Sequence, residues 1–377
     1  MMNVMIVVTH LLGTGHLARA LTLGHAFVAA GDQVTVVSGG GPAPHFDAAG
    51  MTLVQLPPVR SNGTDFTALL RADGGVADPA YMTARRDMLH SALAQAAPDV
   101  LITELFPFGR RILRDEFRAL LEQARAIAPA PLILASIRDI LAPPGKPAKV
   151  AFADGMVAQF YDGVLVHSDP ELVALGRSWP VSARLAQHLH YTGFVAPAPP
   201  ASDAAAHDTI LVSAGGGTVG DTVFAAAMGA AALMPDRNWL FLVGGDDARR
   251  DRLAAQAPPH VRIDPPRRDF RNLLQGAAAS VSMCGYNTAM DVLQTGVPSV
   301  LIPFDDGGEV EQGLRAEALA VQPGIAVLRQ DELVGRTLVA ALQDVCTAAP
   351  RPARRSGMDG ARATVNIAHE MRARPGQ

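Results

Sequence analysis

The sequence predicts an α/β protein of two Rossmann-like, doubly wound domains that face a central cleft. Its 377 residues suit two domains, since one domain typically takes roughly 100–200 residues. Short apolar runs alternate with longer helical patterns, and this alternation starts twice along the chain. A Pro- and Ala-rich stretch without periodicity, VAPAPPASDAAAH, separates the two series. We therefore expect a first domain over residues 1–195, a linker over 196–207 and a second domain over 208–377.

The first series contains apolar runs that indicate buried strands. Continuous runs such as VMIVV and VLIT suit parallel strands that are covered on both faces. The predicted strands are Val4–Val8, Val34–Ser38, Leu53–Leu56, Val100–Thr103, Leu132–Ser136 and Gly163–Val166. An amphipathic helix is expected over Leu17–Ala30. The segment Arg60–Ala77 is expected to be a long, irregular loop.

The second series repeats this architecture. Its predicted strands are Thr209–Ser213, Leu240–Val243, Val261–Asp264, Ser280–Met283 and Ser299–Ile302. The final stretch, Gly357–Arg372, is charged, Ala-rich and helix-like, and we expect it to pack across a surface, with the first domain as the candidate. In two doubly wound domains that face each other, the carboxyl ends of the strands surround the cleft, and ligands are expected there.

Composition narrows the class of protein. Apolar residues make up 49% and charged residues 18%, which indicates a globular chain. The net charge of -4 gives no general attraction to nucleic acid or to an anionic membrane. Cys284 and Cys346 form neither a disulfide framework nor a metal-ligand spacing, which suits a reducing cytosol. The start of the chain lacks the basic segment of a signal peptide, and no run reaches the ~20 apolar residues that span a bilayer. We expect a soluble, cytoplasmic protein; work at a membrane surface is neither implied nor excluded.

A first motif, LLGTGHLARA, directly follows the first predicted strand. Gly13 and Gly15 let the backbone approach a ligand, and the next helix presents free N–H groups and its positive dipole end. His16 opens that helix, where it could take a proton from a hydroxyl near neutral pH. The alternative is a capping histidine in a tight turn. The third glycine of GxGxxG is absent, which disfavours a dinucleotide site.

A second motif, SAGGGTVGDT, lies at the same place in the second series. Its backbone N–H groups and hydroxyls could bind phosphate oxygens. The candidate phosphate ligands are Ser213, Gly215, Gly216, Gly217 and Thr218. The motif lacks the GK[ST] of a Walker A loop, and a plain Gly-rich turn remains the alternative.

A third motif covers Ser282–Ala316 and contains most of the predicted binding residues. After a strand and a turn that includes Gly285 and Tyr286, a helix is expected to begin near Asn287. Asn287 and Thr288 could cap that helix or bind a diphosphate.

Acidic and amide side chains follow within the same motif. Asp291 lies one turn into the helix, where a carboxylate could accept hydrogen bonds from ribose hydroxyls. Glu311 and Gln312, after the next predicted strand, could bind sugar hydroxyls. Asp305–Asp306 also follow that strand, but beside two glycines they indicate a loop, and we expect no metal site.

This third motif resembles the donor-binding signature of glycosyltransferases of the GT-B fold. Plant secondary-product glucosyltransferases carry a Cys-Gly-Trp-Asn-Ser run, then a Glu, a Gly-Val-Pro and an Asp-Gln pair. Here Cys284–Thr288 occupy the run, Asp291 falls at the Glu, Gly296–Pro298 keep the Gly-Val-Pro, and Glu311–Gln312 match the last pair. The likeness extends to the wider UDP-glucuronosyl/glucosyltransferase superfamily and to the lipid II N-acetylglucosaminyltransferase of peptidoglycan synthesis. The opening motif also resembles a group of predicted bacterial glycosyltransferases.

Three positions depart from the plant pattern. Met283 stands where the plant enzymes have a phosphate-binding His, Arg315 replaces the Asn before Ala316, and Asp291 is one methylene shorter than Glu. They affect the identity of the donor more than the class of enzyme.

Further candidates lie at other strand ends. Glu104, in TELFPFGRR, could orient His16 or bind an acceptor, and Asp139 is the alternative partner of His16. Phe270 could stack on or flank a base. His167, in VLVHSDP, reads as an ordinary loop histidine.

The resemblance implies an inverting, metal-independent transfer of a sugar from a UDP-sugar, without a cofactor, to an acceptor that stays open. The second domain would hold the donor, the first domain the acceptor, and His16 would act as base. One alternative is a UDP-sugar hydrolase, because the GTGHxxR-like string resembles the Gly-His loop of bacterial UDP-sugar hydrolases. Others are a non-catalytic nucleotide-sugar sensor and, more distantly, a 2-epimerase of the same fold.

Overall fold

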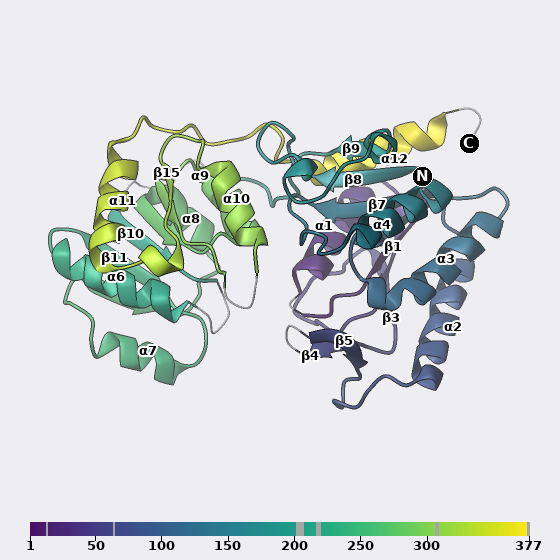
Figure 1. The fold of residues 1–377 in the computed structure, drawn as a ribbon, viewed down its shortest axis with the longest axis horizontal. Coiled ribbons are helices and arrows are strands. Elements are labelled where there is room, and N and C mark those ends of the chain that lie inside the picture. The colour runs from purple at the N-terminus through teal and green to yellow at the C-terminus, as the bar shows by residue number, and fades with distance from the viewer. Residues whose placement is uncertain (13, 63–64, 201–206, 216–219, 306–308, 375–377) are drawn as a thin grey trace. The chain divides into compact units, whose positions relative to one another are not determined.

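The computed structural model describes residues 1–377 except 13, 63–64, 201–206, 216–219, 306–308 and 375–377. The chain forms two compact units: unit 1 is Met1–Pro197 with Asp359–Gln377, and unit 2 is Ala198–Met358 (Figure 1). Each unit is an α/β layer structure around its own parallel sheet.

The sheet of unit 1 has seven strands in the order β3-β2-β1-β6-β7-β8-β9, all of them parallel. The strands are β1 (Asn3–Val8), β2 (Gln33–Ser38), β3 (Met51–Gln55), β6 (Val100–Glu104), β7 (Leu132–Arg138), β8 (Gly163–His167) and β9 (Leu189–Tyr191). The strand order reverses between β1 and β6. Ligands of doubly wound sheets bind beyond the carboxyl ends of the strands at such a switch point.

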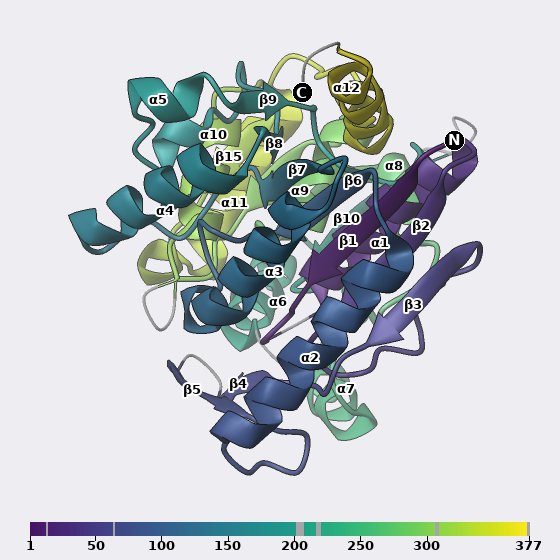
Figure 2. The ribbon, with the colours of Figure 1, turned by 90° about the vertical axis from the view of Figure 1, so that its right-hand side faces the viewer.

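Helices cover both faces of this sheet, because side chains of successive strand residues point to opposite faces. One face packs on α1 (Gly15–Ala29) and α12 (Gly360–Ala373). The other packs on α2 (Pro79–Ala96), α3 (Arg114–Ala126) and α4 (Pro147–Phe160) (Figure 2). The short helix α5 (Ala183–Ala186) follows later in the chain.

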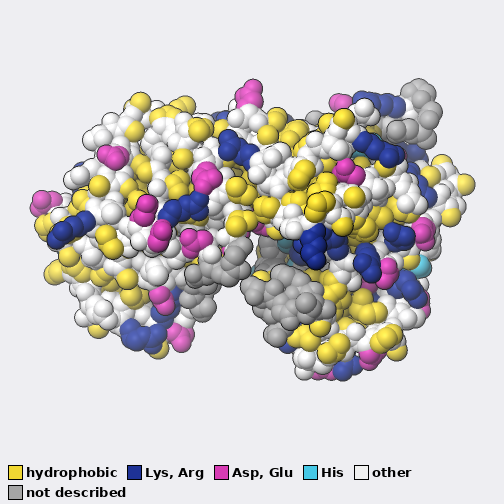
Figure 3. Space-filling view, viewed as in Figure 1, with side chains coloured by type: hydrophobic (Ala, Val, Ile, Leu, Met, Phe, Trp, Pro, Cys, Tyr) yellow, Lys and Arg dark blue, Asp and Glu magenta, His cyan; other side chains and the backbone are white. Residues whose placement is uncertain are grey.

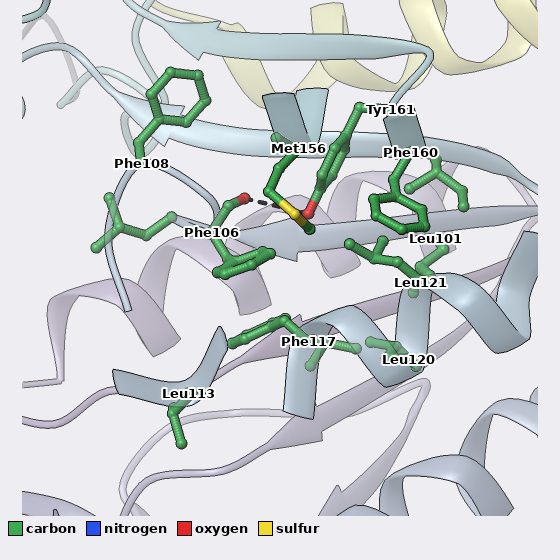
Figure 4. Close-up of a cluster of buried hydrophobic side chains, with 14 of the residues drawn as sticks. Leu101, Phe106, Phe108, Leu113, Phe117, Leu120, Leu121, Met156, Phe160 and Tyr161 are labelled. Atoms are coloured by element: carbon green, nitrogen blue, oxygen red, sulfur yellow. Dashed lines mark hydrogen bonds between the residues drawn. The ribbon is translucent and has the colours of Figure 1, made fainter. Parts of the chain in front are cut away.

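The core between the sheet of unit 1 and helices α2, α3 and α4 contains the segment that follows β6. Phe106 and Phe117 stack with ring centroids 4.5 Å apart, and the Tyr161 hydroxyl points toward the Phe106 carbonyl (Figure 4). Thr103 Oγ1 donates to the same carbonyl at 3.1 Å and lies 2.8 Å from the Tyr161 hydroxyl. The chain just beyond the end of β6 is therefore anchored in a rigid apolar cluster.

The expectation of an irregular segment over Arg60–Ala77 is wrong in part. β4 (Arg60–Asn62) and β5 (Asp65–Leu70) pair as antiparallel strands. Asn62, the last residue of β4, is the register partner of Asp65, the first residue of β5.

Unit 2 has a six-stranded parallel sheet in the order β12-β11-β10-β13-β14-β15. Its strands are β10 (His207–Ser213), β11 (Asn238–Leu242), β12 (Val261–Asp264), β13 (Ala277–Ser282), β14 (Ser299–Leu301) and β15 (Ile325–Val327). Its helices are α6 (Asp221–Leu233), α7 (Asp247–Ala254), α8 (Phe270–Gly276), α9 (Tyr286–Thr295), α10 (Glu311–Leu319) and α11 (Gly335–Thr347). The switch point lies between β10 and β13, and α6 and α11 pack on the core.

The final helix, α12, belongs to unit 1. Its Val365, Ala368 and Met371 are buried in the core beside α1. His369 Nε2 lies 2.7 Å from Asp32 Oδ2, and the backbone at Asp359 pairs with Val195. The boundary between the units falls between Pro197 and Ala198, inside the Pro- and Ala-rich stretch.

Candidate functional site

The switch point of unit 1 carries a cluster of charged and polar side chains. His16 is the second residue of α1, just after β1, and Glu104 is the last residue of β6. His16 Nδ1 lies 2.9 Å from Glu104 Oε1. Arg19, one helical turn beyond His16, donates to the same carboxylate oxygen, and its Nη2 lies 3.1 Å from His16 Nδ1. The Glu104 side chain is 1% exposed and that of His16 15% exposed, so the imidazole is the part of this pair within reach of a ligand.

A hydrogen-bonded chain continues from Glu104 across the sheet. Ser136 Oγ, on β7, donates to Glu104 Oε2 at 2.6 Å and lies 2.9 Å from His167 Nε2, at the end of β8. His167 Nδ1 in turn lies 2.9 Å from Thr192 Oγ1. A hydroxyl has one hydrogen, and since that of Ser136 goes to the carboxylate, His167 Nε2 carries the hydrogen that Ser136 accepts. His167 is thus part of a buried network, which its place in the sequence did not indicate.

The protonation of this cluster follows from burial and from one cation. Burial lowers the pKa of His16 to about 3, and the nearby Arg19 cation acts in the same direction. Burial alone raises the pKa of Glu104, but Arg19 and His16 outweigh it and hold that pKa well below its usual range. Burial also lowers the pKa of His167 to about 3. The site therefore combines neutral imidazoles with an ionised carboxylate.

The backbone next to Glu104 makes a sharp turn. Leu105 has φ +68°, in the left-handed region that non-glycine residues rarely adopt. Its N–H donates to the Ser136 carbonyl at 2.8 Å, and Phe106 follows in the core cluster of Figure 4. Strained backbone persists where the surroundings over-determine it, often at functional sites. Of the two acidic residues predicted as partners of His16, the structure places Glu104 against the imidazole.

In unit 2, two serines lie side by side at the switch point. Ser213 ends β10, Ser282 ends β13, and the two are register partners. Both are buried, and in the described part of the chain the Ser282 hydroxyl has no hydrogen-bond partner. Gly215 follows with φ +79°, a conformation that suits glycine. Of the other predicted glycine-loop residues, Gly216, Gly217, Thr218 and, in unit 1, Gly13 lie outside the described residues, while Gly15 is the exposed first residue of α1.

Helix α9 begins at Tyr286, one residue earlier than expected. Gly285 is the N-cap, and no side chain caps the helix, so Asn287 and Thr288 do not serve as caps. A Cβ placed on Gly285 would meet no atom within 4 Å, so there is open space at this helix end. The N-terminus of a helix suits an anion.

Arg315, on α10, reaches this same turn. It is buried, donates to the Cys284 carbonyl at 3.0 Å and lies over the Tyr286 ring, 5.8 Å from its centroid. The residue that departs from the plant pattern therefore holds the turn before α9 and brings a positive charge close to it.

Asp291 has a partner that the sequence did not indicate. Arg271 Nε, on α8, donates to Asp291 Oδ1 at 2.7 Å, and the same guanidinium bonds Gln294 and the Ala198 carbonyl. Burial raises the pKa of Asp291, and Arg271 opposes that shift. Phe270, the half-buried first residue of α8, is the neighbour of Arg271. The Asp291 carboxylate thus links α9 to α8.

Glu311 and Gln312 form the first turn of α10. The Glu309 side chain accepts from the Glu311 N–H at 2.6 Å and from the Gln312 N–H at 3.4 Å, which caps the helix. Gln312 Oε1 accepts from the Phe304 N–H at 3.2 Å and so fixes the segment after β14.

The Gly-Val-Pro segment has a structural role. Gly296 ends α9 with φ +74°, and a Cβ there would lie 2.6 Å from the Arg351 carbonyl oxygen. Arg351 is buried and donates to the Val292 and Val297 carbonyls at 3.0 and 2.7 Å. These contacts fix the end of α9, opposite to the end that carries Gly285.

Sequence reasoning missed four residues of these networks: Arg19, Ser136, His167 and Arg271. Arg19 had a local signal, since residues three apart on a helix share a face, and His16 and Arg19 have that spacing. The others had none, because their partners are far away in the sequence.

The described residues also bear on metal binding and on membrane insertion. They contain no group of three or more His, Cys, Asp or Glu side chains that could hold a metal ion. No helix among them is both long and apolar enough to cross a membrane. On the face in Figure 3, acidic and basic side chains are interspersed with hydrophobic ones on each unit.

Comparison with known proteins relates these features to a family. Residues 246–371 match the glycosyltransferase family 28 C-terminal domain. Two curated relatives carry the name UDP-N-acetylglucosamine–N-acetylmuramyl-(pentapeptide) pyrophosphoryl-undecaprenol N-acetylglucosamine transferase. The one from Brucella anthropi is 31% identical over 135 residues, 34% of this chain and 36% of the relative. The one from a Synechococcus strain is 33% identical over 91 residues, 24% of this chain and 25% of the relative. The chain thus spans about a third or less of these relatives.

Solved structures match over almost the whole chain. MurG of Acinetobacter baumannii has a TM-score of 0.64 at 14% identity, with 98% of this chain and 100% of that chain covered. The calicheamicin glycosyltransferase CalG4 has a TM-score of 0.60 at 17% identity, covering 99% and 95%. Phytolacca americana UGT2, complexed with UDP-2fluoro-glucose and pterostilbene, has 0.58 at 14%, covering 98% and 100%. The predicted fold class is confirmed: two parallel-sheet α/β units, as in these GT-B glycosyltransferase structures. The predicted resemblance to the lipid II N-acetylglucosaminyltransferases is confirmed over the matched segments.

Proposed function

We propose that this protein is a glycosyltransferase that moves a sugar from a UDP-sugar to an acceptor hydroxyl, with inversion and without a metal. The observation that carries the proposal is the His16–Glu104 pair at the switch point of unit 1. The family 28 match in unit 2 supports a nucleotide-sugar donor. We place the reaction in the cytoplasm, where the free thiols Cys284 and Cys346 stay reduced.

His16 is the proposed base. With its Nδ1–H donated to ionised Glu104, the lone pair of Nε2 is available to take the acceptor's proton. Glu104 then stabilises the imidazolium that forms, as the acid does in a Ser-His-Asp triad. The acceptor oxygen attacks the anomeric carbon as the bond to the diphosphate oxygen breaks, and UDP leaves.

Unit 2 is the proposed donor site. Negative charge grows on the departing diphosphate, and preorganised donors aimed at that charge are the main catalytic device available without a metal. The start of α9 at Gly285–Thr288, with Arg315 beside it, suits that role. The remaining proposed donor ligands of unit 2 are Ser213, Gly215, Gly216, Gly217, Thr218, Phe270, Asp291, Glu311 and Gln312. Gly13 and Gly15, in unit 1, stay predictions from the sequence.

The first test is binding of UDP and UDP-sugars to the intact chain in the presence of a chelator. Ligand at 100 times its dissociation constant stabilises a protein by ~2.7 kcal/mol, so a melting shift should appear without divalent metal. UDP-N-acetylglucosamine is the first donor to try, because the curated relatives' names contain it. A shift with NAD or ATP and none with any UDP compound contradicts the proposal.

Turnover then separates the alternatives. UDP release that requires an acceptor supports a transferase, and rapid release in water alone supports a UDP-sugar hydrolase in which His16 activates water. Binding without turnover across an acceptor panel supports a sensor. We expect His16→Ala to lower turnover by ~10²–10⁴-fold with nearly unchanged UDP affinity. The matched control is His25→Ala, on the same helix but bonded to the Asp47 carbonyl, which should keep wild-type activity.

A further inference from the structure

His16 Nδ1 has two neighbours that make opposite demands on it. Glu104 Oε1, at 2.9 Å, is an acceptor and requires a hydrogen on Nδ1, whereas Arg19 Nη2, at 3.1 Å, is a donor and requires a lone pair there. A ring nitrogen offers one or the other. Arg19 also donates to the same Oε1, so Arg19 and His16 compete for one carboxylate oxygen.

This competition matters because a buried carboxylate beside a lone imidazole draws a proton onto the ring. The product is an imidazolium–carboxylate pair, and an imidazole that is already protonated cannot act as a base. A guanidinium keeps its charge at any ordinary pH. A carboxylate that is always paired with a guanidinium stabilises a protonated imidazole less, so the imidazole stays neutral more readily.

We propose that Arg19 is a positioning residue, which occupies the Glu104 carboxylate and thereby keeps His16 in its neutral, base-competent form. It lies one turn from His16 on α1 and is buried together with Glu104, and in such surroundings the interaction between charges is strong.

A second cation near His16 shifts the pKa of the imidazole in the same direction as Arg19 does. Arg110, in the segment after β6, also lowers the pKa of His16, while Glu104 raises it and burial lowers it most. Behind Glu104, Ser136 donates to the second carboxylate oxygen, Oε2, and the neutral His167 in turn contacts the Ser136 hydroxyl. Arg19 is therefore the cation in direct contact with both members of the pair.

Histidine NMR of the intact chain tests this without any turnover. The protein is labelled with 15N-histidine, the His16 signals are assigned by their loss in His16→Gln, and the protonation of the ring is followed against pH. In the wild type we expect His16 to stay neutral well below pH 6.5. In Arg19→Met its pKa should rise by roughly one pH unit or more, and Arg19→Lys, which keeps the charge, should restore most of the wild-type value. Arg114→Met removes an exposed cation of unit 1 and should leave the His16 titration unchanged.

Activity adds an independent readout that rests on the proposed function. The acid limb of the kcat/KM profile should move to higher pH in Arg19→Met by the same amount as the NMR titration. If no turnover is found with any donor but the NMR shift occurs, the proposed function fails and the role of Arg19 stands. A His16 titration that is the same in Arg19→Met and wild type overturns the role. Should Arg19→Met not fold, a wild-type His16 that titrates at its ordinary pKa overturns it as well.

Discussion

At the scale of single residues, the buried ionisable groups around Glu104 form one hydrogen-bonded network. An ionised carboxylate is costly inside a protein unless it is paired and hydrogen-bonded, and Glu104 meets both conditions through Arg19, His16 and Ser136. His167 is neutral and lies in the same network, bonded on both ring nitrogens. The network gives Glu104 a single orientation toward His16.

His167 makes stability depend on pH. Its pKa is lowered to about 3 in the folded protein, so below its ordinary value of about 6.5 the unfolded chain binds a proton that the folded chain does not. Stability therefore falls as the pH falls from 6.5 toward 3, by up to ~1.4 kcal/mol per pH unit for this one group. In His167→Gln that contribution disappears.

Urea unfolding at pH 7, 6 and 5 measures this effect. The stability of His167→Gln relative to wild type should improve steadily as the pH falls. The control is Gln33→Ala, an exchange at an exposed position without a titratable group, for which we expect the wild-type dependence. An identical pH dependence in His167→Gln and wild type would show that His167 is not held neutral.

At the scale of elements, α9 is tied to its neighbours along its whole length. Arg315 from α10 holds the turn before it, Arg271 from α8 pairs with Asp291 in its middle, and Arg351 binds the carbonyls at its end. A helix fixed in this way presents its N-terminal N–H groups in a constant direction, as an anion site requires.

Asp291 provides the test at the scale of elements. Its carboxylate pairs with Arg271 and is also proposed to bind the ribose of UDP. If it accepts hydrogen bonds from ribose hydroxyls, Asp291→Ala should weaken UDP binding by roughly tenfold to a hundredfold. Arg271→Gln breaks the same ion pair but keeps the carboxylate, and its UDP affinity should stay near the wild-type value. Calorimetric titration with UDP measures both. Equal losses in the two variants would mean that Asp291 acts only by joining α9 to α8.

At the scale of the whole molecule, unit 1 is built from two separate stretches of chain. Helix α12 comes after the whole of unit 2 in the sequence, yet its apolar side chains complete the core beside α1. The core of unit 1 therefore includes helix α12 as well as the residues that precede unit 2.

The exchange Met371→Ala tests how much α12 contributes to unit 1. Met371 is buried in the core, and truncating a buried Met to Ala typically costs 2–5 kcal/mol. The control is Glu370→Ala at the neighbouring exposed position, which should change stability by less than about 0.5 kcal/mol. Thermal or urea unfolding of the intact chain compares the two. Similar small effects would show that α12 only lies against the surface.

The apolar pattern of the sequence was enough to predict the class of fold and the position of most strands. Runs such as Val4–Val8 and Val100–Thr103 coincide with β1 and β6 to within a residue, because buried parallel strands carry an apolar pattern within their own few residues. The short strands β9 and β15 were not predicted: β9 (Leu-His-Tyr) has no apolar run, whereas the apolar run of β15 (Ile-Ala-Val) was overlooked. The β4–β5 pair was not predicted either, because β4 (Arg-Ser-Asn) contains no apolar residue.

For the site, the sequence was enough to propose residues whose role is indicated by their position at the end of a strand or the start of a helix. His16 was predicted because it follows a strand and opens a helix, and Glu104 because it follows the end of a strand and would face the same cleft. All of the predicted catalytic and ligand roles stay predictions, and Gly13, Gly216, Gly217 and Thr218 also lie outside the described residues.

Which side chains share a partner could be learned only from the folded chain. Arg19, Ser136 and His167 come from three different elements, and Arg271 meets Asp291 across two helices. The place of α12 was decided in the same way, because an amphipathic helix shows that it must bury a face but not which core will bury it. A periodic pattern is a property of neighbouring residues, whereas the partner of a buried charge depends on which strand ends and helices the whole fold brings together.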